Sequence, residues 1–484
     1  MNPFTWLHRL DRSLYRTATS RRSRRLDRTL IPLSRAADRS LLWIGVAAVL
    51  AAAGGRFGRR AALRGLLSVG LTSAIVNGPL KYLAGRKRPT PSKPPTRPLR
   101  RTHTTASFPS GHSASAFAFA TGAALEVPAL GLPLGAAAAG VAASRVYAGV
   151  HYPGDVLAGS VAGAVVGLAT TRFWPLTSHE PAQLRPSLAR VDSEPFPDGD
   201  GVTFVVNPEA GPAFARNPAD VLREALPAAR VIETGEGLDL GKALEMAAAD
   251  ARTIGIAGGD GSVNAAAEKA LDRNLPMVVV PSGTLNHLAR DLGLTSARDS
   301  IEAVQHGQAA AVDVSTIDGK PFLNTASFGS YVELVDAREK LETRIGKWPA
   351  VVVALVKVLR TSRPVTVEIN GELLRVWMIF IGNCRYHPQG FAPSWRERLD
   401  DGLLDVRIVD GRRPLACIRL ILALLTGTLA RSRVYRASVV RRLDVRFVEP
   451  GPVRLARDGE TFEGSRHFKV EKRRPPLNIY VPRA

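Results

Sequence analysis

The chain is poor in cysteine, and the two that it has, Cys384 and Cys417, are too few for a disulfide scaffold or a cysteine-rich metal site. We expect both thiols to be free. Zinc-finger spacing and the aromatic signature of RNA-binding domains are also absent, which argues against a nucleic-acid partner. Acidic residues are outnumbered, because 43 Asp and Glu oppose 65 Lys and Arg and leave a net charge of +22. The expected partner is therefore another anion, a membrane surface or a phosphorylated substrate.

We do not expect a secretory signal, because no long apolar run or small-residue cleavage site follows the first charged residues. Leucines recur at roughly helical intervals in this segment, around a cluster formed by Arg21, Arg22, Arg24, Arg25 and Arg28. Residues 1–39 are therefore predicted to be a basic amphipathic helical segment at a membrane interface. The alternative is a solvated, arginine-rich tail.

Charge is nearly absent from several segments between residues 40 and 174. These runs are rich in Ala and Gly, and they cover 41–55, 65–80, 113–143 and 156–171. A bilayer-spanning helix needs about 20 apolar residues. We therefore predict an all-α membrane bundle of about five spans over 40–174, with a soluble helical bundle as the alternative.

A multidomain chain is expected from its length of 484 residues. Residues 175–200 contain five prolines among polar residues and are predicted to form a linker without a regular element. From 201 to 311, apolar strands alternate with helical stretches, which predicts an α/β nucleotide-binding lobe. Short strands dominate 312–484, including one at 477–481, and predict a second, β-rich lobe.

The helical region contains the groups needed to bind a phosphate ester. Phosphate oxygens require cationic donors, and Lys81, Arg88 and Arg145 are the candidates. Ser110 and the amides near Gly111 come where an apolar helix begins, and a helix N-terminus is itself a phosphate-binding feature.

The same region contains the groups needed to cleave the ester. His151 can attack phosphorus if a carboxylate holds its other ring nitrogen, and Asp155 is close enough in sequence to do so. His112 can then protonate the leaving alkoxide. This set of residues requires no metal.

The pattern closely resembles the type 2 phosphatidic acid phosphatase family. The matching pieces occur in the family's order and spacing, and they are Lys81 with Arg88-Pro89, Pro109 to His112, and Ser144-Arg145 with His151 and Asp155. The resemblance implies a helical bundle, a phosphohistidine intermediate on His151 and metal-independent hydrolysis. Soluble acid phosphatases and vanadium haloperoxidases share this signature, so it leaves a non-lipid substrate open.

The second half lacks a Walker motif, and no Gly-x-Gly-x-x-Gly follows its first strand. It has instead a glycine cluster between a strand and a helix, where backbone amides can approach phosphates closely. The candidate nucleotide-binding residues lie in this cluster and at two other strand ends: Asn207, Gly258, Gly259, Asp260, Gly261, Ser262, Ser282, Gly283, Thr284 and Asn286.

These motifs resemble the diacylglycerol kinase catalytic domain, which is shared with sphingosine kinases and bacterial lipid kinases. The family's Gly-Gly-Asp-Gly-Thr is present with Ser262 in the last place, and Pro281 to Asn286, Asp401 to Asp405 and Asp458-Gly459-Glu460 match its later motifs. The resemblance implies a nucleotide lobe joined to a β-sandwich lobe, with ATP as phosphate donor. Two departures affect nucleotide or acceptor preference: Ala265 and His287 stand where the family has Glu and commonly Asp.

Within that resemblance, Asp458 is the expected general base that takes the proton of the acceptor hydroxyl. Asp260 is expected to organise the nucleotide and its magnesium, while Asp401 and Asp405 are candidates for a structural magnesium. Turn residues that bound a strand are the alternative interpretation of Asp401 and Asp405.

The sequence thus predicts a bifunctional, multi-pass enzyme of the cell membrane: a lipid phosphate phosphatase without a cofactor, fused to an ATP- and magnesium-dependent lipid kinase in the cytoplasm. Its expected partners are lipids, lipid phosphates and the membrane. One alternative is a soluble or peripheral enzyme that acts on small phosphates and alcohols. In another, one half is a regulatory module without catalysis.

Overall fold

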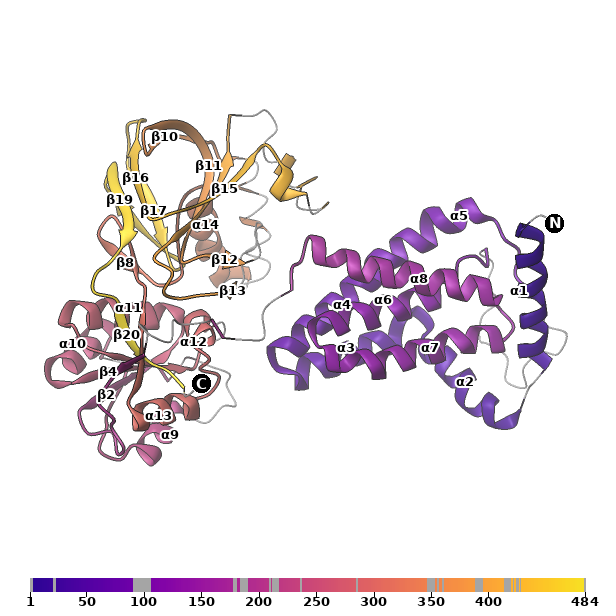
Figure 1. The fold of residues 1–484 in the computed structure, drawn as a ribbon, viewed down its shortest axis with the longest axis horizontal. Coiled ribbons are helices and arrows are strands. Elements are labelled where there is room, and N and C mark those ends of the chain that lie inside the picture. Colours follow the sequence, from indigo (N-terminus) through magenta and orange to yellow (C-terminus); the bar gives the residue numbers. More distant parts are fainter. Residues whose placement is uncertain are drawn as a thin grey trace. The chain divides into compact units, whose positions relative to one another are not determined.

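The structure is a computed structural model that describes residues 3–20, 23–89, 106–176, 181–182, 190–208, 210, 217–235, 237–283, 286–345, 353–354, 357–358, 361–387, 395–412, 419–420, 422–423, 426 and 428–482. The chain divides into two compact units, Met1–Thr177 and Ser178–Ala484 (Figure 1). Each unit is described by itself below. Cys417 and Thr284 lie outside the described residues.

The first unit is helical throughout its described residues, as the sequence predicts. Its elements are α1 (Pro3–Ser20), α2 (Arg24–Ala36), the 3₁₀ turn η1 (Asp38–Ser40), α3 (Leu41–Ala53), α4 (Gly55–Ile75), the π-helical turn η2 (Val76–Leu80), α5 (Lys81–Ala84), α6 (Gly111–Glu126), η3 (Pro128–Leu130), α7 (Gly131–Tyr147), α8 (Pro153–Ala169) and η4 (Thr170–Arg172). Helix α6 packs on α4, α7 and α8 (Figure 1). The core around Trp43 and Phe119 contains many alanines, which let these helices approach closely.

Within the described residues, three helices are long and apolar enough to cross a membrane: Gly55–Ala84, Pro128–Tyr147 and Pro153–Arg172. A fourth span results if the bent pair Arg24–Ala36 and Asp38–Ala53 counts as one. The sequence prediction of about five spans exceeds this number. Helix α6, with 16 residues, is shorter than a typical span of roughly 17 to 25.

Helix α8 approaches α6 through glycines at every fourth position. An added Cβ at Gly163 would lie 2.0 Å from the carbonyl oxygen of Ala114, and one at Gly159 would lie 2.4 Å from that of Ser110. Backbone atoms cannot yield as a flexible side chain does, so glycine is required at both positions. This close approach brings the start of α6 next to the start of α8.

Replacing Gly163 with alanine should force α6 and α8 apart and destabilise the helical unit by about 1–3 kcal/mol or more. The matched control is Gly135→Ala on α7, where an added Cβ meets nothing within 4 Å. Thermal unfolding in detergent should show a lower Tm for Gly163→Ala and no loss for Gly135→Ala. Equal Tm values for the two variants would contradict the close approach.

The second unit begins with a seven-stranded sheet in the order β1-β6-β20-β5-β4-β2-β3. Its strands are β1 (Arg190–Asp192), β2 (Val202–Val206), β3 (Arg230–Glu233), β4 (Thr253–Gly258), β5 (Met277–Pro281), β6 (Gln308–Val312) and β20 (Leu477–Tyr480). Helices α10 (Leu240–Asp250), α11 (Asp260–Arg273) and α12 (His287–Asp291) share one core with this sheet. Helices α9 (Pro218–Ala225) and α13 (Ala297–His306) share the other, so helices cover both faces. Because both faces are covered, β2 and β4 are buried along their whole length.

An antiparallel sheet of 11 strands forms the rest of this unit. Its strands are β7 (Ser315–Ile317), β8 (Lys320–Phe322), β9 (Thr325–Gly329), β10 (Val365–Ile369), β11 (Glu372–Asn383), β14 (Leu404–Asp410), β15 (Tyr435–Val440), β16 (Arg442–Phe447), β17 (Val453–Arg457), β18 (Glu460–Gly464) and β19 (His467–Lys472). The short pair β12 (Tyr386–His387) and β13 (Trp395–Arg396), helix α14 (Ser330–Ile345) and η5 (Leu429–Arg431) accompany it.

The large sheet curls around its own core. Phe328 on β9 and Phe468 on β19 are four strands apart in the sheet, yet their ring centroids are 6.2 Å apart. Four spacings of about 4.8 Å would separate them by far more in a flat sheet. The two ends of the sheet therefore face each other across the core.

Two sequence predictions about the segment boundaries are wrong. Residues 175–200 are not free of regular elements, because β1 pairs with β6 at the edge of the first sheet. The strand predicted at 477–481 does not belong to the β-rich lobe, because β20 inserts between β5 and β6 of the first sheet. Both strands are short and local composition does not show which sheet they join.

Candidate active sites

The start of α8 positions the histidine and aspartate that the sequence singles out. His151 and Asp155 are both buried, and His151 Nδ1 lies 3.5 Å from Asp155 Oδ2. Asp155 Oδ2 also accepts the Tyr152 amide at 3.0 Å, which caps the helix and fixes the carboxylate. Asp155 is thus held beside the ring by the first turn of its own helix.

The other nitrogen of His151 faces an arginine. Arg88 Nη1 lies 3.2 Å from His151 Nε2. Because a guanidinium only donates hydrogen bonds, this contact uses the lone pair of Nε2 and places the ring proton on Nδ1, toward Asp155. His151 therefore presents an unprotonated Nε2 at the place where a cation can hold a phosphate.

Burial, together with the nearby guanidinium groups of Arg145 and Arg88, lowers the pKa of His151 to about 4, although the hydrogen bond and charge of Asp155 act in the opposite direction. A histidine in the unfolded chain titrates near pH 6.5. Between these two values the unfolded state binds the proton and the folded state does not, so stability falls as the pH falls.

As the pH falls from about 6.5 to about 4, the free energy of unfolding of the wild type should therefore decrease by on the order of 1.4 kcal/mol per pH unit from His151 alone. His151→Asn removes the titration, so its Tm should depend less steeply on pH over this window than the wild-type Tm. Parallel Tm-against-pH curves for the two proteins would show that His151 titrates normally.

The remaining phosphate-binding candidates surround the same helix ends. Ser110 caps α6, and its amide donates to the Asp155 carbonyl at 2.9 Å. An added Cβ at Gly111 would lie 3.5 Å from Lys81 Nζ, so the ammonium lies at the start of α6. Arg145 is fully buried and donates to Ser34 Oγ at 2.7 Å.

Three side chains that sequence reasoning missed contact this region. Arg86 Nη1 donates to Asp155 Oδ1, and Arg86 Nη2 donates to Asp11 Oδ2, each at 2.6 Å. Asp38 Oδ1 lies 2.8 Å from His112 Nε2. Asp11 and Asp38 lie far from the motifs along the chain, and Arg86 occupies one of the unspecified positions between Lys81 and Arg88.

In the second unit, the two glycine-containing loops meet. An added Cβ at Gly283 would lie 2.5 Å from the Cα of Gly259, so the loops after β4 and β5 touch. Asn286 Oδ1 accepts the Gly283 amide at 2.9 Å, and its Nδ2 donates to the Gly283 carbonyl at 2.8 Å. This bracing shapes the second loop beside the N-terminus of α11.

The loop after β4 lies next to residues at neighbouring strand ends. The Asn207 amide donates to the Ala257 carbonyl at 2.9 Å, and Ser262 lies beside Gly258 on the first turn of α11. The Asp260 carboxylate accepts the His287 amide at 2.7 Å, and the His287 ring contacts Arg290. Ser282 Oγ donates to the Val280 carbonyl at 3.3 Å.

Asp458 and Glu460 reach this region from the large sheet. An added Cβ at Gly261 would lie 3.5 Å from Glu460 Oε1, so the C-terminal acidic motif lies against the glycine cluster. The Asp458 carboxylate accepts three amides, those of Leu323, Asn324 and Thr325, at 2.8 to 2.9 Å. Burial raises the pKa of Asp458 despite these bonds.

A fully buried arginine fixes the segment that holds Asp458. Arg396 donates to the Leu323 carbonyl at 2.7 Å and pairs with Asp291 of α12 at 2.7 Å. Arg396 therefore connects the segment around Leu323, which binds Asp458, to helix α12 of the nucleotide lobe. Sequence reasoning missed this residue because it belongs to none of the motifs.

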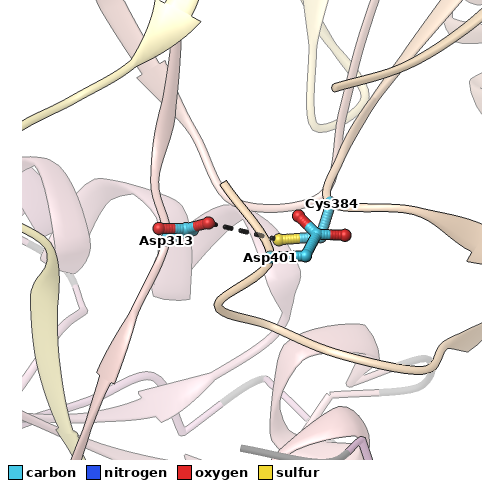
Figure 2. Close-up of side chains that lie close together, drawn as sticks. All are labelled: Asp313, Cys384 and Asp401. Atoms are coloured by element: carbon cyan, nitrogen blue, oxygen red, sulfur yellow. Dashed lines mark hydrogen bonds between the residues drawn. The ribbon is translucent and has the colours of Figure 1, made fainter. Parts of the chain in front are cut away.

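The two aspartates predicted to hold a structural magnesium have different partners in the structure. Asp405 pairs with Arg407 at 2.7 Å and does not fit a magnesium ligand. Asp401 lies instead with Asp313 and Cys384, whose ligand atoms are within 4.8 Å of one another (Figure 2).

The chemistry of this three-residue cluster does not fit magnesium either. Burial raises the pKa of Cys384 to about 12, so the thiol stays protonated, and magnesium prefers oxygen ligands. Lys472 Nζ lies 3.4 Å from Asp313 Oδ2 and 3.3 Å from Cys384 Sγ, which places an ammonium beside the cluster. Asp401, whose two oxygens accept the amides of Arg385 and Leu403, and Asp260 remain as carboxylate candidates.

The comparisons with known proteins match both halves. The PAP2 superfamily model matches residues 61–178, and the diacylglycerol kinase catalytic domain model matches residues 201–317. A probable lipid kinase YegS-like of Pseudomonas aeruginosa is 30% identical over 299 residues, which are 59% of this chain and 95% of the relative. A diacylglycerol kinase of Bacillus subtilis is 30% identical over 242 residues, 46% of this chain and 78% of the relative.

Among solved structures, a transmembrane PAP2-type phosphatidylglycerolphosphate phosphatase of Bacillus subtilis is 22% identical, with a TM-score of 0.30. That match covers 37% of this chain and 90% of the phosphatase. The phosphatase motifs and the two glycine-containing kinase motifs fall within the matched ranges, whereas Asp401 to Asp405 and Asp458 to Glu460 lie beyond residue 317. The chain therefore belongs to the diacylglycerol kinase family of lipid kinases and carries a PAP2 superfamily domain ahead of its kinase domain.

Proposed function

We propose that the chain is a bifunctional membrane enzyme that hydrolyses a lipid phosphate in its helical unit and phosphorylates a lipid hydroxyl from ATP in its second unit. The observation that carries the proposal is the placement of His151, whose unprotonated Nε2 lies beside Arg88 while Nδ1 faces Asp155. A buried histidine whose Nδ1 faces a carboxylate has the arrangement that nucleophilic attack on phosphorus requires, which supports this role for His151.

In the phosphatase reaction, Lys81, Arg88 and Arg145 bind the phosphate oxygens together with the N-terminus of α6. Arg88 turns from His151 to a phosphate oxygen when the substrate binds, and the Nε2 lone pair that it frees forms a bond to phosphorus as the bond to the lipid oxygen breaks. His112 gives the leaving oxygen its proton, and Asp155 stabilises the imidazolium. Water then displaces the histidine and releases inorganic phosphate, and no step uses a metal.

In the kinase reaction, the amides of the two glycine-containing loops and the N-terminus of α11 bind the ATP phosphates. Asp458 takes the proton of the lipid hydroxyl as its oxygen attacks the terminal phosphorus, and the raised pKa of Asp458 suits this role. Magnesium, when bound, would neutralise charge on the phosphates, and Asp260 is the residue that would hold it there, whereas Asp401 is kept as a candidate for a separate structural magnesium.

The helical unit is proposed to cross the membrane with its phosphatase site on the outer side and the kinase in the cytoplasm, where ATP is. His151 and Asp155 lie at the start of the Pro153–Arg172 span, and the chain continues to the kinase from its end. Arg60 and Arg64 pair with Glu126, and Arg64 also binds Thr170 at the end of that span, which places positive residues at the proposed cytoplasmic end. Positive residues favour the cytoplasmic side. The arginine-rich N-terminal segment, which contacts the phosphatase site through Asp11 and Asp38, runs against this tendency.

Protease added to sealed, intact cells should therefore leave residues 201–484 undigested, whereas permeabilised cells should lose them. A tag inserted in the kinase unit reports the outcome by immunoblot. Digestion of the kinase in sealed cells would reverse the proposed orientation.

The two activities are tested together on the purified full chain in detergent. Labelled ATP with a panel of lipid alcohols should give labelled lipid phosphate, and a panel of lipid phosphates should release inorganic phosphate in the presence of EDTA. Hydrolysis restricted to small water-soluble phosphates would indicate the non-lipid alternative. Absence of transfer from ATP to any lipid would indicate a regulatory second unit.

A further inference from the structure

The N-terminal segment, residues 3–40, lies outside the part of the chain that the PAP2 model matches, yet it contacts the phosphatase site repeatedly. The contacts are Asp11 with Arg86 (2.6 Å), Ser34 with Arg145 (2.7 Å) and Asp38 with His112 (2.8 Å). We propose, building on the phosphatase function above, that this segment completes the site through two positioning residues. Asp38 positions the proton donor His112, and Asp11 positions the nucleophile His151 through Arg86 and Asp155.

The backbone places Asp38 at a sharp bend. Helices α2 and α3 are bent by 63° around η1, and Arg39 and Ser40 have φ values of 52° and 61°. Residues other than glycine rarely adopt this left-handed conformation, and they keep it only where the surrounding structure imposes it. The bend directs the Asp38 carboxylate at His112.

This contact has a chemical consequence for the leaving group. The Asp38 carboxylate accepts the proton on Nε2 of His112, so the proton that goes to the leaving oxygen is the one on Nδ1. A carboxylate at 2.8 Å also stabilises the doubly protonated ring, which is the form that can donate.

Asp11 acts on the other histidine. Arg86 bridges Asp155 and Asp11, and its guanidinium lies 4.2 Å from the centre of the Tyr152 ring. Asp11 Oδ1 also accepts the Gly154 amide at 2.8 Å, in the first turn of α8. Because Asp11 offsets part of the positive charge of Arg86, Arg86 neutralises less of the negative charge with which Asp155 supports His151 during attack.

The two positioning residues serve different parts of the reaction, so two substrates separate them. An alkyl phosphate such as a lipid phosphate needs a proton on its leaving oxygen, whereas the p-nitrophenolate of p-nitrophenyl phosphate leaves without one. Asp38→Asn should lower kcat/KM for the alkyl phosphate by about 10- to 100-fold and leave that for p-nitrophenyl phosphate unchanged. Asp11→Asn should lower kcat/KM for both, since attack by His151 is common to both substrates.

Two control variants distinguish a loss of activity caused by mispositioned histidines from one caused by misfolding. Asp27→Asn removes another buried carboxylate of the segment, one that accepts from Tyr147 Oη at 2.7 Å, so it should lower Tm without changing the ratio of the two rates. Asp38→Glu should restore part of the alkyl phosphatase activity lost in Asp38→Asn. All variants are measured as the full chain in detergent.

The outcomes separate this proposal from the function on which it rests. A wild type that hydrolyses neither ester overturns the phosphatase function itself. An active wild type whose Asp38→Asn variant slows both esters equally, or neither, overturns the role of Asp38. Unchanged rates in Asp11→Asn overturn the role of Asp11.

Discussion

Replacing His151 with alanine should remove lipid phosphatase activity and leave ATP-dependent lipid phosphorylation in place. The reaction loses the atom that bonds to phosphorus, and nothing else in the described site is placed to replace Nε2. Asp155→Asn should reduce turnover by about 10⁴, the cost of the corresponding change in a carboxylate-histidine pair of serine hydrolases. Phosphate release from a lipid phosphate, measured in EDTA, checks both variants.

The intermediate provides the direct test of this mechanism. Rapid quenching with labelled lipid phosphate should trap label that is stable in base and lost in acid, as expected for a phosphoramidate, and peptide mapping should place it on His151. His112→Ala should reduce its formation from lipid phosphates. Label on another residue, or a strict need for a divalent metal in hydrolysis, would contradict the phosphohistidine route.

Replacing Asp458 with asparagine should reduce lipid phosphorylation by about 10²- to 10⁴-fold, the usual contribution of a general base. The amide keeps the size of the side chain, but it cannot take the proton of the lipid hydroxyl. Transfer of label from ATP to lipid, compared with phosphatase activity in the same preparation, gives the measurement.

Asp444→Asn is the matched control, because Asp444 lies on an exposed part of β16 and pairs with His467 rather than with the site. It should leave transfer unchanged. Three amides hold Asp458, so a change in Tm must be measured alongside activity. Loss of both activities from Asp458→Asn in a folded protein would mean that the two units are catalytically coupled.

The sequence alone was sufficient to identify both families and to predict the reacting groups. Phosphate chemistry needs particular residue types at short spacings. His151 lies just before α8 and Asp155 in its first turn, so local geometry already places them together. The fold class was predicted from features within single elements: runs nearly free of charge for α7, α8 and the later part of α4, and short apolar segments for the buried strands β2 and β4.

Only the tertiary structure showed which distant residues serve these groups. Asp11, Asp38 and Arg396 belong to no motif, because a hydrogen bond between side chains far apart in the chain imposes no periodicity on the sequence. The bond between Asp38 and His112 spans 74 positions, and that between Asp11 and Arg86 spans 75. The sequence likewise does not determine which sheet β20 joins, because a short apolar strand can pair with either sheet. Packing of the core decides between them. Residues close together in the sequence therefore determine the local chemistry. The positioning of the reacting groups by distant residues depends on how helices and strands pack, which the sequence pattern does not show.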